Sequence, residues 1–200
     1  MLSDEPQQPM PNGKARLIDA VLSCMAEFGH SGTTVRKIAE IADVTPGLVK
    51  HHFGNKEALL VETYRHLNQL ALDRIEAAIE ANLENVETAL DGAIEALFPG
   101  DLSDVRQMRV LVAFWGLVLS DQAFADVQAG TNTEMRKLFA GLLRPHSQST
   151  ADSYDIADGL IALTDGLWLE CCMNPNRMTA SKAISIAKRL SRRNISFLSA

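Results

Sequence analysis

Apolar residues recur every three or four positions along most of this 200-residue chain, and this spacing constrains the fold more than any other feature. It is the spacing of one face of an α-helix, whereas a half-buried β-strand would alternate apolar and polar residues. No segment of the sequence is typical of a strand. The first example of the helical spacing is Leu17, Ile18, Val21, Leu22, Met25 and Phe28. The chain is therefore expected to be all-α.

Glycine, proline and small polar residues divide this pattern into about nine helices. Gly29 supplies a stop for the first, Thr33 and Thr34 offer N-caps for the second, and Pro46 stands in the first turn of the third, where its missing N–H does no harm. The predicted helices cover residues 14–28, 35–41, 45–52, 56–82, 86–98, 103–120, 121–143, 150–173 and 180–198.

The apolar segments are too short for a membrane protein. The longest, Val110–Leu119, has ten residues, about half of the roughly 20 that span a bilayer. Residues 1–12 are acidic and rich in Pro and Gln, and they lack the basic start and apolar core of a secretory signal. We expect a cytoplasmic protein that has no membrane partner and begins with a disordered tail, residues 1–12.

Charge is distributed unevenly between two predicted domains, residues 13–56 and residues 57–200. The whole chain has a net charge of −6, which argues against nucleic acid as a partner. Residues 13–56, however, hold six Lys and Arg against four Asp and Glu, a net of +2, and residues 57–200 hold −6. A basic head on an acidic body fits a head that approaches polyanions.

The second and third predicted helices are short and joined by a tight turn, which is the helix-turn-helix pattern. Ala39 is small where the two helices cross, and Val44 and Val49 fill the angle between them. Asp43 occupies the turn position that favours φ > 0, where glycine is usual and Asp is tolerated. Lys50, His51 and His52 are expected to face outward.

The segment Thr33–Leu60, TTVRKIAEIADVTPGLVKHHFGNKEALL, resembles the DNA-binding segment of the TetR family of bacterial repressors. The resemblance implies a homodimer whose two heads read a palindromic double-stranded DNA operator while the helical body binds a small-molecule inducer that releases the DNA. It also implies contacts with bases or phosphates from Thr34, Arg36, Thr45, Pro46, Gly47, Lys50, His51, His52 and Lys56. The alternative for each basic residue alone is a solvated surface position.

Lys50 departs from the family pattern, in which tyrosine is common at this position. Because Lys pairs with the O6 and N7 atoms of guanine, this residue is expected to favour a guanine contact. Thr34, Arg36 and Lys56 match positions that typically touch phosphates at helix N-termini.

The body is similar to the choline-responsive, BetI-like branch of the family, through Arg109–Asp121 and Gly159–Glu170. That similarity assigns Trp115, Asp165 and Trp168 to the inducer site, because a quaternary ammonium is bound by aromatic faces and an anion. Glu170 departs from the branch, which usually has arginine there. Three alternatives remain: the tryptophans belong to the core, the ligand is an unrelated small apolar or aromatic molecule, or the chain binds a ligand but no longer DNA.

The last two predicted helices are the usual dimer interface of the family, with apolar stripes formed by Ile161, Leu163, Leu167, Ile184, Ile186 and Leu190. An enzyme is not expected, because the sequence has no glycine-rich phosphate loop, no Cys/His metal spacing and no nucleophile motif. No cofactor or metal is predicted. Cys24, Cys171 and Cys172 are interpreted as small buried or half-buried thiols.

Overall fold

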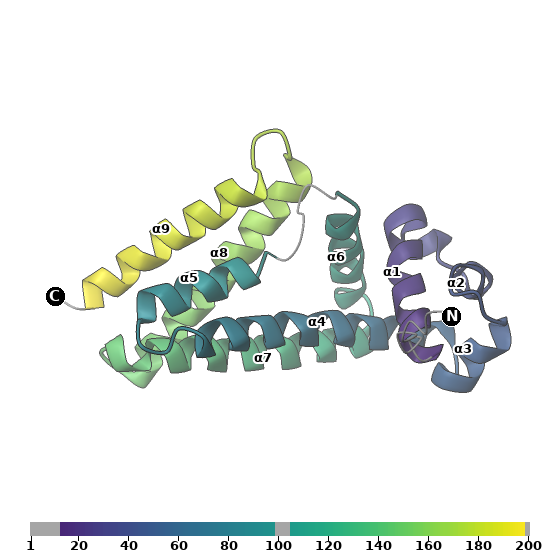
Figure 1. The fold of residues 1–200 in the computed structure, drawn as a ribbon, viewed down its shortest axis with the longest axis horizontal. Helices are drawn as coiled ribbons and strands as arrows, with labels where there is room; N and C mark the ends of the chain where they lie inside the picture. Colours follow the sequence, from purple (N-terminus) through teal and green to yellow (C-terminus); the bar gives the residue numbers. More distant parts are fainter. Residues whose placement is uncertain (1–12, 99–104, 199–200) are drawn as a thin grey trace, which may run out of the picture. The chain divides into compact units, whose positions relative to one another are not determined.

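The computed structural model describes residues 13–98 and 105–198, with side chains described over residues 13–98 and 109–192. These residues form nine α-helices, one short 3-10 helix and no strand (Figure 1). The elements are α1 (Gly13–Gly32), α2 (Val35–Ile41), α3 (Pro46–Phe53), α4 (Lys56–Glu80), α5 (Val86–Ala96), α6 (Val105–Val118), α7 (Gln122–Leu143), η1 (Arg144–His146), α8 (Thr150–Met173) and α9 (Ala180–Leu198). The all-α prediction is confirmed; the predicted tail, residues 1–12, lies outside the described residues.

The helix ends follow the stop and start signals of the sequence. In α1 the backbone leaves helical geometry at Gly29, with φ 65° and ψ −177°, at the predicted stop. Six helices follow a residue whose side chain accepts a hydrogen bond from a backbone N–H of the first turn: Thr34, Asn55, Asn85, Asp121, Ser149 and Thr179. Such caps satisfy N–H groups that have no partner inside the helix.

The chain folds as two compact units that meet between Thr63 and Tyr64, inside α4. We call the residues up to Thr63 the head unit and those from Tyr64 the body unit. In the head unit, α1 packs against α2 and α2 against α3. The buried side chains of the head unit include Leu17, Val21, Met25, Ile38, Ala39, Val49 and, from the start of α4, Leu59 and Leu60.

In the body unit, α5, α7, α8 and α9 enclose one large core, which also receives Ile75 of α4. Helices α8 and α9 pack against one another, as do α7 and α8 (Figure 1). Charged side chains join α5 to α9 at the surface: Lys188 Nζ lies 3.8 Å from Asp91 Oδ2, and Arg192 also pairs with Asp91. Burial of apolar surface is the main term that stabilises such an assembly.

All three cysteines are free: Cys24 and Cys171 are buried and Cys172 is half-buried. Burial is the main reason why the pKa of each thiol is raised. A raised pKa reduces the fraction of reactive thiolate near neutral pH. The interpretation of these residues as small buried or half-buried thiols is confirmed.

Within residues 13–98 and 105–198, no single helix is both long and apolar enough to cross a membrane. The segments Arg109–Val118 and Gln122–His146 reach that length and composition only as a pair, across a bend of 110°.

Candidate nucleic-acid interface and ligand site

The turn between α2 and α3 is built around Asp43. Its φ of 51° lies in the left-handed region, as predicted for this turn position. Val44 N donates to Ala39 O at 2.9 Å and Asp43 N donates to Glu40 O at 3.2 Å, so backbone hydrogen bonds close the turn. Val44 is half-buried and Val49 is 1% exposed, so both fill the angle between the helices, as predicted.

Helix α3 leaves half of its residues exposed to solvent. Val49 is its one buried residue, and this side chain attaches the helix to the rest of the head unit. Thr45 is the N-cap residue, but its side chain makes no capping hydrogen bond. The exposed residues on and next to α3 include Thr45, Pro46, Gly47, Lys50 and His51. A short helix with exposed polar and small residues and one buried anchor has the chemistry to enter a DNA groove.

His52 differs from the exposed Lys50 and His51, because it is half-buried. A Cβ atom placed on Gly13 would lie 3.2 Å from His52 Nε2 and 3.2 Å from Leu48 Cδ2, so both side chains pack closely against the start of α1. The His52 ring also lies edge-on to His51 and Phe53, with centroids 4.9 and 6.2 Å away. The expectation that His52 faces outward with Lys50 and His51 is therefore wrong: the side chain turns toward α1.

The residues predicted to touch phosphates lie at helix N-termini. Thr34 is exposed, and its Oγ1 accepts a hydrogen bond from Lys37 N at 3.3 Å as the cap of α2. Arg36 is exposed in the first turn of that helix. Lys56, the first residue of α4, is half-buried with Nζ 3.7 Å from Glu57 Oε1. The helix dipole favours anions at these ends.

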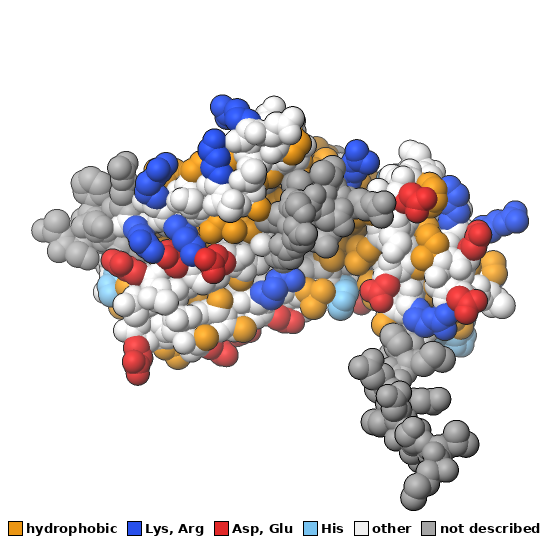
Figure 2. Space-filling model, turned by 45° about the horizontal axis from the view of Figure 1, so that its top comes forward, with side chains coloured by type: hydrophobic (Ala, Val, Ile, Leu, Met, Phe, Trp, Pro, Cys, Tyr) orange, Lys and Arg blue, Asp and Glu red, His pale blue; other side chains and the backbone are white. Residues whose placement is uncertain are grey.

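On the face drawn in Figure 2, Lys and Arg side chains are interspersed with Asp and Glu over both units. The net positive charge of the predicted head is therefore not gathered into one patch on this face. Individual basic residues, rather than a continuous basic surface, would make the contacts with a polyanion there.

In the body unit, Trp168 lies in the core. Its side chain is 8% exposed, its indole Nε1 donates to Leu97 O at 2.8 Å, and its ring stacks on Phe98 with centroids 6.0 Å apart and planes 7° apart. A buried indole N–H needs such an acceptor. These contacts explain the burial of Trp168 without a ligand.

Trp115 and its neighbour Phe114 occupy different environments on α6. Trp115 is half-buried and packs against the large core. Phe114 is fully buried in a separate aromatic cluster with Tyr64 of α4 and Phe124 of α7, at centroid distances of 5.0 Å from Tyr64 and 6.1 Å from Phe124. Adjacent positions on a helix point about 100° apart, which accounts for this separation.

Asp165 on α8 is exposed to solvent, yet desolvation by the surrounding protein raises its pKa to about 6. It lies near enough to Tyr64 to act on that hydroxyl: burial raises the pKa of Tyr64 to about 12, hydrogen bonding with Asn68 opposes the rise, and the negative charge of Asp165 adds to it. The described residues provide no ion pair or hydrogen bond for Asp165.

Polar side chains from α4 and α7 border the aromatic cluster. The Tyr64 hydroxyl donates to Gln128 Oε1, and Gln128 Nε2 donates to Asn132 Oδ1 at 2.8 Å. Asn68 Nδ2, one turn after Tyr64, is buried and makes no hydrogen bond of standard geometry among the described residues. The cluster around Tyr64 thus offers aromatic rings and an amide donor, and the charge of Asp165 acts on its hydroxyl.

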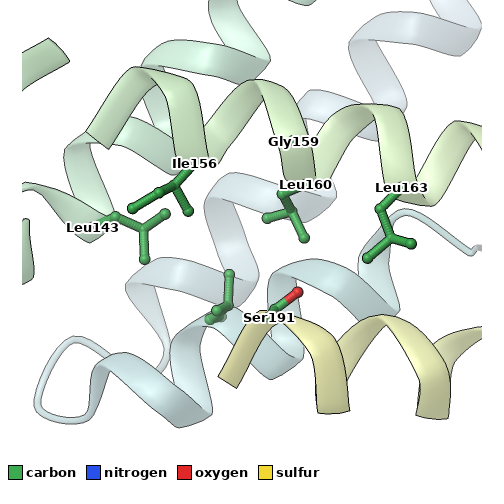
Figure 3. A pocket seen from close by; sticks show the side chains of 7 residues that line it. Leu143, Ile156, Gly159, Leu160, Leu163 and Ser191 are labelled. Carbon is green, nitrogen blue, oxygen red and sulfur yellow. The ribbon is translucent and has the colours of Figure 1, made fainter. Parts of the chain in front are cut away.

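A small hollow lies elsewhere, between α8 and α9. Figure 3 shows Leu143, Ile156, Leu160 and Leu163 on one side of it and Ser191 on the other; Leu90 and Gly159 complete the lining. Its volume is about 30 Å³, room for about two or three water molecules. Trp115, Asp165 and Trp168 do not line it.

The comparisons with known families decide the identity. A model described as the BetI-type transcriptional repressor, C-terminal, matches residues 86–195, more than half of the chain. A second model, described as bacterial regulatory proteins of the tetR family, matches residues 17–63. The chain belongs to the TetR family. Members of this family are transcriptional regulators with a DNA-binding helix-turn-helix, not enzymes, which confirms the regulator interpretation and the BetI-like resemblance.

Individual relatives agree with this TetR-family assignment. The regulator BetI of Vibrio vulnificus (strain YJ016) is 28% identical over 97% of this chain and 98% of its own length. A structure described as a transcriptional regulator from Pseudomonas aeruginosa PAO1 has a TM-score of 0.80 and 32% identity, covering 96% of this chain and 93% of that one. A Saccharomonospora viridis regulator solved in complex with choline has a TM-score of 0.72 and 19% identity, covering 92% and 95%.

Glu170, the departure from the BetI-like pattern, lies in the last turn of α8. Its Oε2 accepts a hydrogen bond from Asn174 Nδ2 at 3.2 Å and lies 3.5 Å from Arg177 Nη2. These contacts hold the segment after α8 and account for the carboxylate at this position of the TetR-family body.

Sequence reasoning missed the cluster formed by Tyr64, Asn68, Phe114, Phe124 and Gln128. They come from α4, α6 and α7, and no local motif joins them. An isolated tyrosine within the apolar stripe of α4 was the one available signal, because a buried hydroxyl needs a polar partner.

Proposed function

We propose that this TetR-family chain is a homodimeric repressor that reads a palindromic operator with α3 and is released by a small cationic inducer bound near Asp165. The observation that carries the DNA part is the exposure of α3 around a single buried anchor, Val49. The cytoplasm, where the DNA lies, is its proposed location.

For DNA binding, we assign base contacts to the exposed residues of α3 and its N-cap, and phosphate contacts to residues at the N-termini of α2 and α4. Thr45, Pro46, Gly47, Lys50 and His51 are exposed, and Gly47 lets the backbone come close to the groove. The half-buried His52 is assigned a minor part. Two such heads in a dimer would contact half-sites about 34–36 Å apart.

The dimer is proposed to form through the outer faces of α8 and α9. Ile161 and Leu167, two of the residues expected there, are 8% exposed each and belong to the core of the chain itself, so they have little surface left for a partner. Leu163, Ile184, Ile186 and Leu190 are half-buried or exposed and remain candidates. The exposed Gly159, Ala162 and Gly166 of α8 would allow a second helix to approach closely.

For the inducer, choline or a related trimethylammonium compound is the proposed class. Its cation would neutralise Asp165, a carboxylate with a raised pKa and no partner among the described residues. Trp115 would supply an aromatic face, and Trp168 would act from the core by supporting α8. The BetI-type body and the choline complex of the Saccharomonospora viridis relative support this class.

Release requires the inducer to bind the conformation that cannot engage DNA more tightly than the one that can. Helix α4 belongs to both units, since Lys56–Thr63 lie in the head unit and Tyr64–Glu80 in the body unit. Through Tyr64, inducer binding near Asp165 would affect α4 directly.

Two experiments test the proposal. Wild-type chain is used to select duplexes from a random-sequence library, and the selected duplex is then bound at two salt concentrations, with and without choline. Calorimetry with choline, betaine and betaine aldehyde measures inducer binding. We expect the selected duplexes to share a palindromic consensus. At least one of the three compounds should weaken binding to the selected duplex. Selection of no sequence would overturn the operator proposal and favour a ligand-binding protein without DNA. Heat from none of the three would remove the cationic inducer in favour of an apolar or aromatic ligand.

A further inference from the structure

Arg16 of α1 contacts the turn of the helix-turn-helix twice. Its Nη2 donates to the main-chain oxygen of Asp43 at 3.1 Å and lies 3.5 Å from Asp43 Oδ2. Asp43 is the only non-glycine residue of the described chain with a positive φ. One guanidinium therefore holds both the backbone and the side chain of the residue that sets the angle between α2 and α3.

Asp43 has a reason to need this support. A residue with a Cβ pays in steric energy for the left-handed region, whereas glycine does not. The side chain of Asp43 is 98% exposed, and an exposed ion pair alone contributes little. The hydrogen bond to the carbonyl oxygen is charge-assisted, and such bonds are stronger and more directional than neutral ones. It fixes the peptide whose orientation determines where α3 begins.

Arg16 would otherwise be counted among the basic residues that meet phosphates. Its side chain is 32% exposed and its guanidinium is already engaged by Asp43. We propose that Arg16 is a positioning residue: it clamps Asp43, fixes the direction of α3, and so controls operator affinity without touching DNA. This inference rests on the operator binding proposed above and adds a residue to it.

The test is a mutant cycle on the full-length chain, with the duplex selected by wild type as the probe. Arg16→Gln should weaken binding to this duplex about tenfold, or about 1.4 kcal/mol. Asp43→Gly supplies a residue that adopts φ 51° without support, so Arg16→Gln in that background should weaken binding by less than about threefold. If Asp43→Gly binds no duplex, Asp43→Asn takes its place in the cycle.

The salt dependence separates positioning from a phosphate contact. Arg16→Gln should leave the slope of log K against log salt, and binding to unrelated DNA, unchanged. Arg36→Gln, at a proposed phosphate contact, should reduce the slope by about one. Thermal unfolding of each variant checks that the head unit is folded.

Three results would overturn the inference: a slope reduced by Arg16→Gln, an equal loss in both backgrounds, or wild-type affinity in Arg16→Gln. If wild type itself selects no duplex, the proposed function fails together with the inference. If wild type selects one and Arg16→Gln binds it normally, the inference alone fails.

Discussion

Helix α3 of the head unit has one buried residue, whereas α8 of the body unit has eight. In α3 the exposed side chains are free for a partner, so residue type and order along the helix already indicate what each of them can contact. In α8 eight of the 24 residues are buried in the core, and a functional role for the others is recognised only by what surrounds them. The same family pattern therefore predicts function more directly in the head unit than in the body unit.

Trp168 gives the sharpest test of this difference, because the family pattern suggested a ligand contact and the structure places it in the core. Trp168→Ala should lower the free energy of unfolding by about 3–5 kcal/mol, through lost burial and the cavity left behind. Denaturant unfolding measures the loss. Trp115→Ala, at a half-buried position, is the matched control and should lose less. Unchanged stability with abolished choline binding in Trp168→Ala would make Trp168 a ligand residue after all.

A Lys50 variant tests whether residue type alone correctly predicts a base contact from α3. Lys50→Ala should weaken binding to the selected duplex by about 1–3 kcal/mol and relax the preference at one base position. Competition between duplexes that differ at single positions measures both effects. Lys37→Ala is a suitable control, since Lys37 Nζ lies over the Phe28 ring, 3.7 Å from its centroid. Equal weakening on all duplexes would assign Lys50 to a phosphate.

Asp165 tests whether a single exposed residue of α8 carries the proposed ligand function. Asp165→Asn should weaken choline binding about tenfold, because the amide cannot neutralise the cation. Asp158→Asn, on the same helix, is the matched control: Asp158 pairs with Arg136 through both its oxygens, and its replacement should leave choline affinity unchanged. Calorimetry decides between them. Equal affinities in the two variants would place the inducer elsewhere.

The raised pKa of Asp165 predicts a smaller effect of pH. Protonation of a carboxyl with a pKa of about 6 removes its charge, so choline affinity should be constant above pH 7 and fall as pH drops through 6. The free energy of unfolding depends on pH in the opposite direction, because the folded state favours the protonated form of Asp165. The contribution of Asp165 to stability is therefore most favourable below its unfolded pKa of 3.8. That contribution is lost as pH rises through 6.

Asp165→Asn should consequently be slightly more stable than wild type at pH 7.5, by roughly 1 kcal/mol, because exposure to water screens part of the penalty. The gain should vanish near pH 4. Thermal melts at the two pH values measure it, and a gain that is the same at both would contradict the assignment.

Local signals predicted the head unit well. Thr34 caps α2, Asp43 adopts the left-handed conformation and Val49 fills the angle between the helices, and each of these depends on neighbours a few residues away. His52 is the exception, because its position depends on Gly13, far away in the sequence.

Contacts across long stretches of sequence limited the prediction for the body unit. The indole of Trp168 is bound by Leu97 O, 71 residues away, and Asp165 acts on Tyr64 from another helix. Periodicity indicates which side of α8 is apolar, but it does not say whether that side meets its own core or a second chain. Ile161 and Leu167 were assigned to the dimer interface for this reason.

The three free cysteines offer a practical route to following the proposed change from the DNA-binding to the released conformation. Their raised pKa values slow alkylation near neutral pH, and two of the three are buried. A thiol-reactive fluorophore or spin label would therefore react mainly with one introduced, exposed cysteine on α3, with little labelling of the native thiols. In the proposed dimer, the distance between two such reporters, one on each protomer, could be recorded while choline is titrated, without first removing any natural residue.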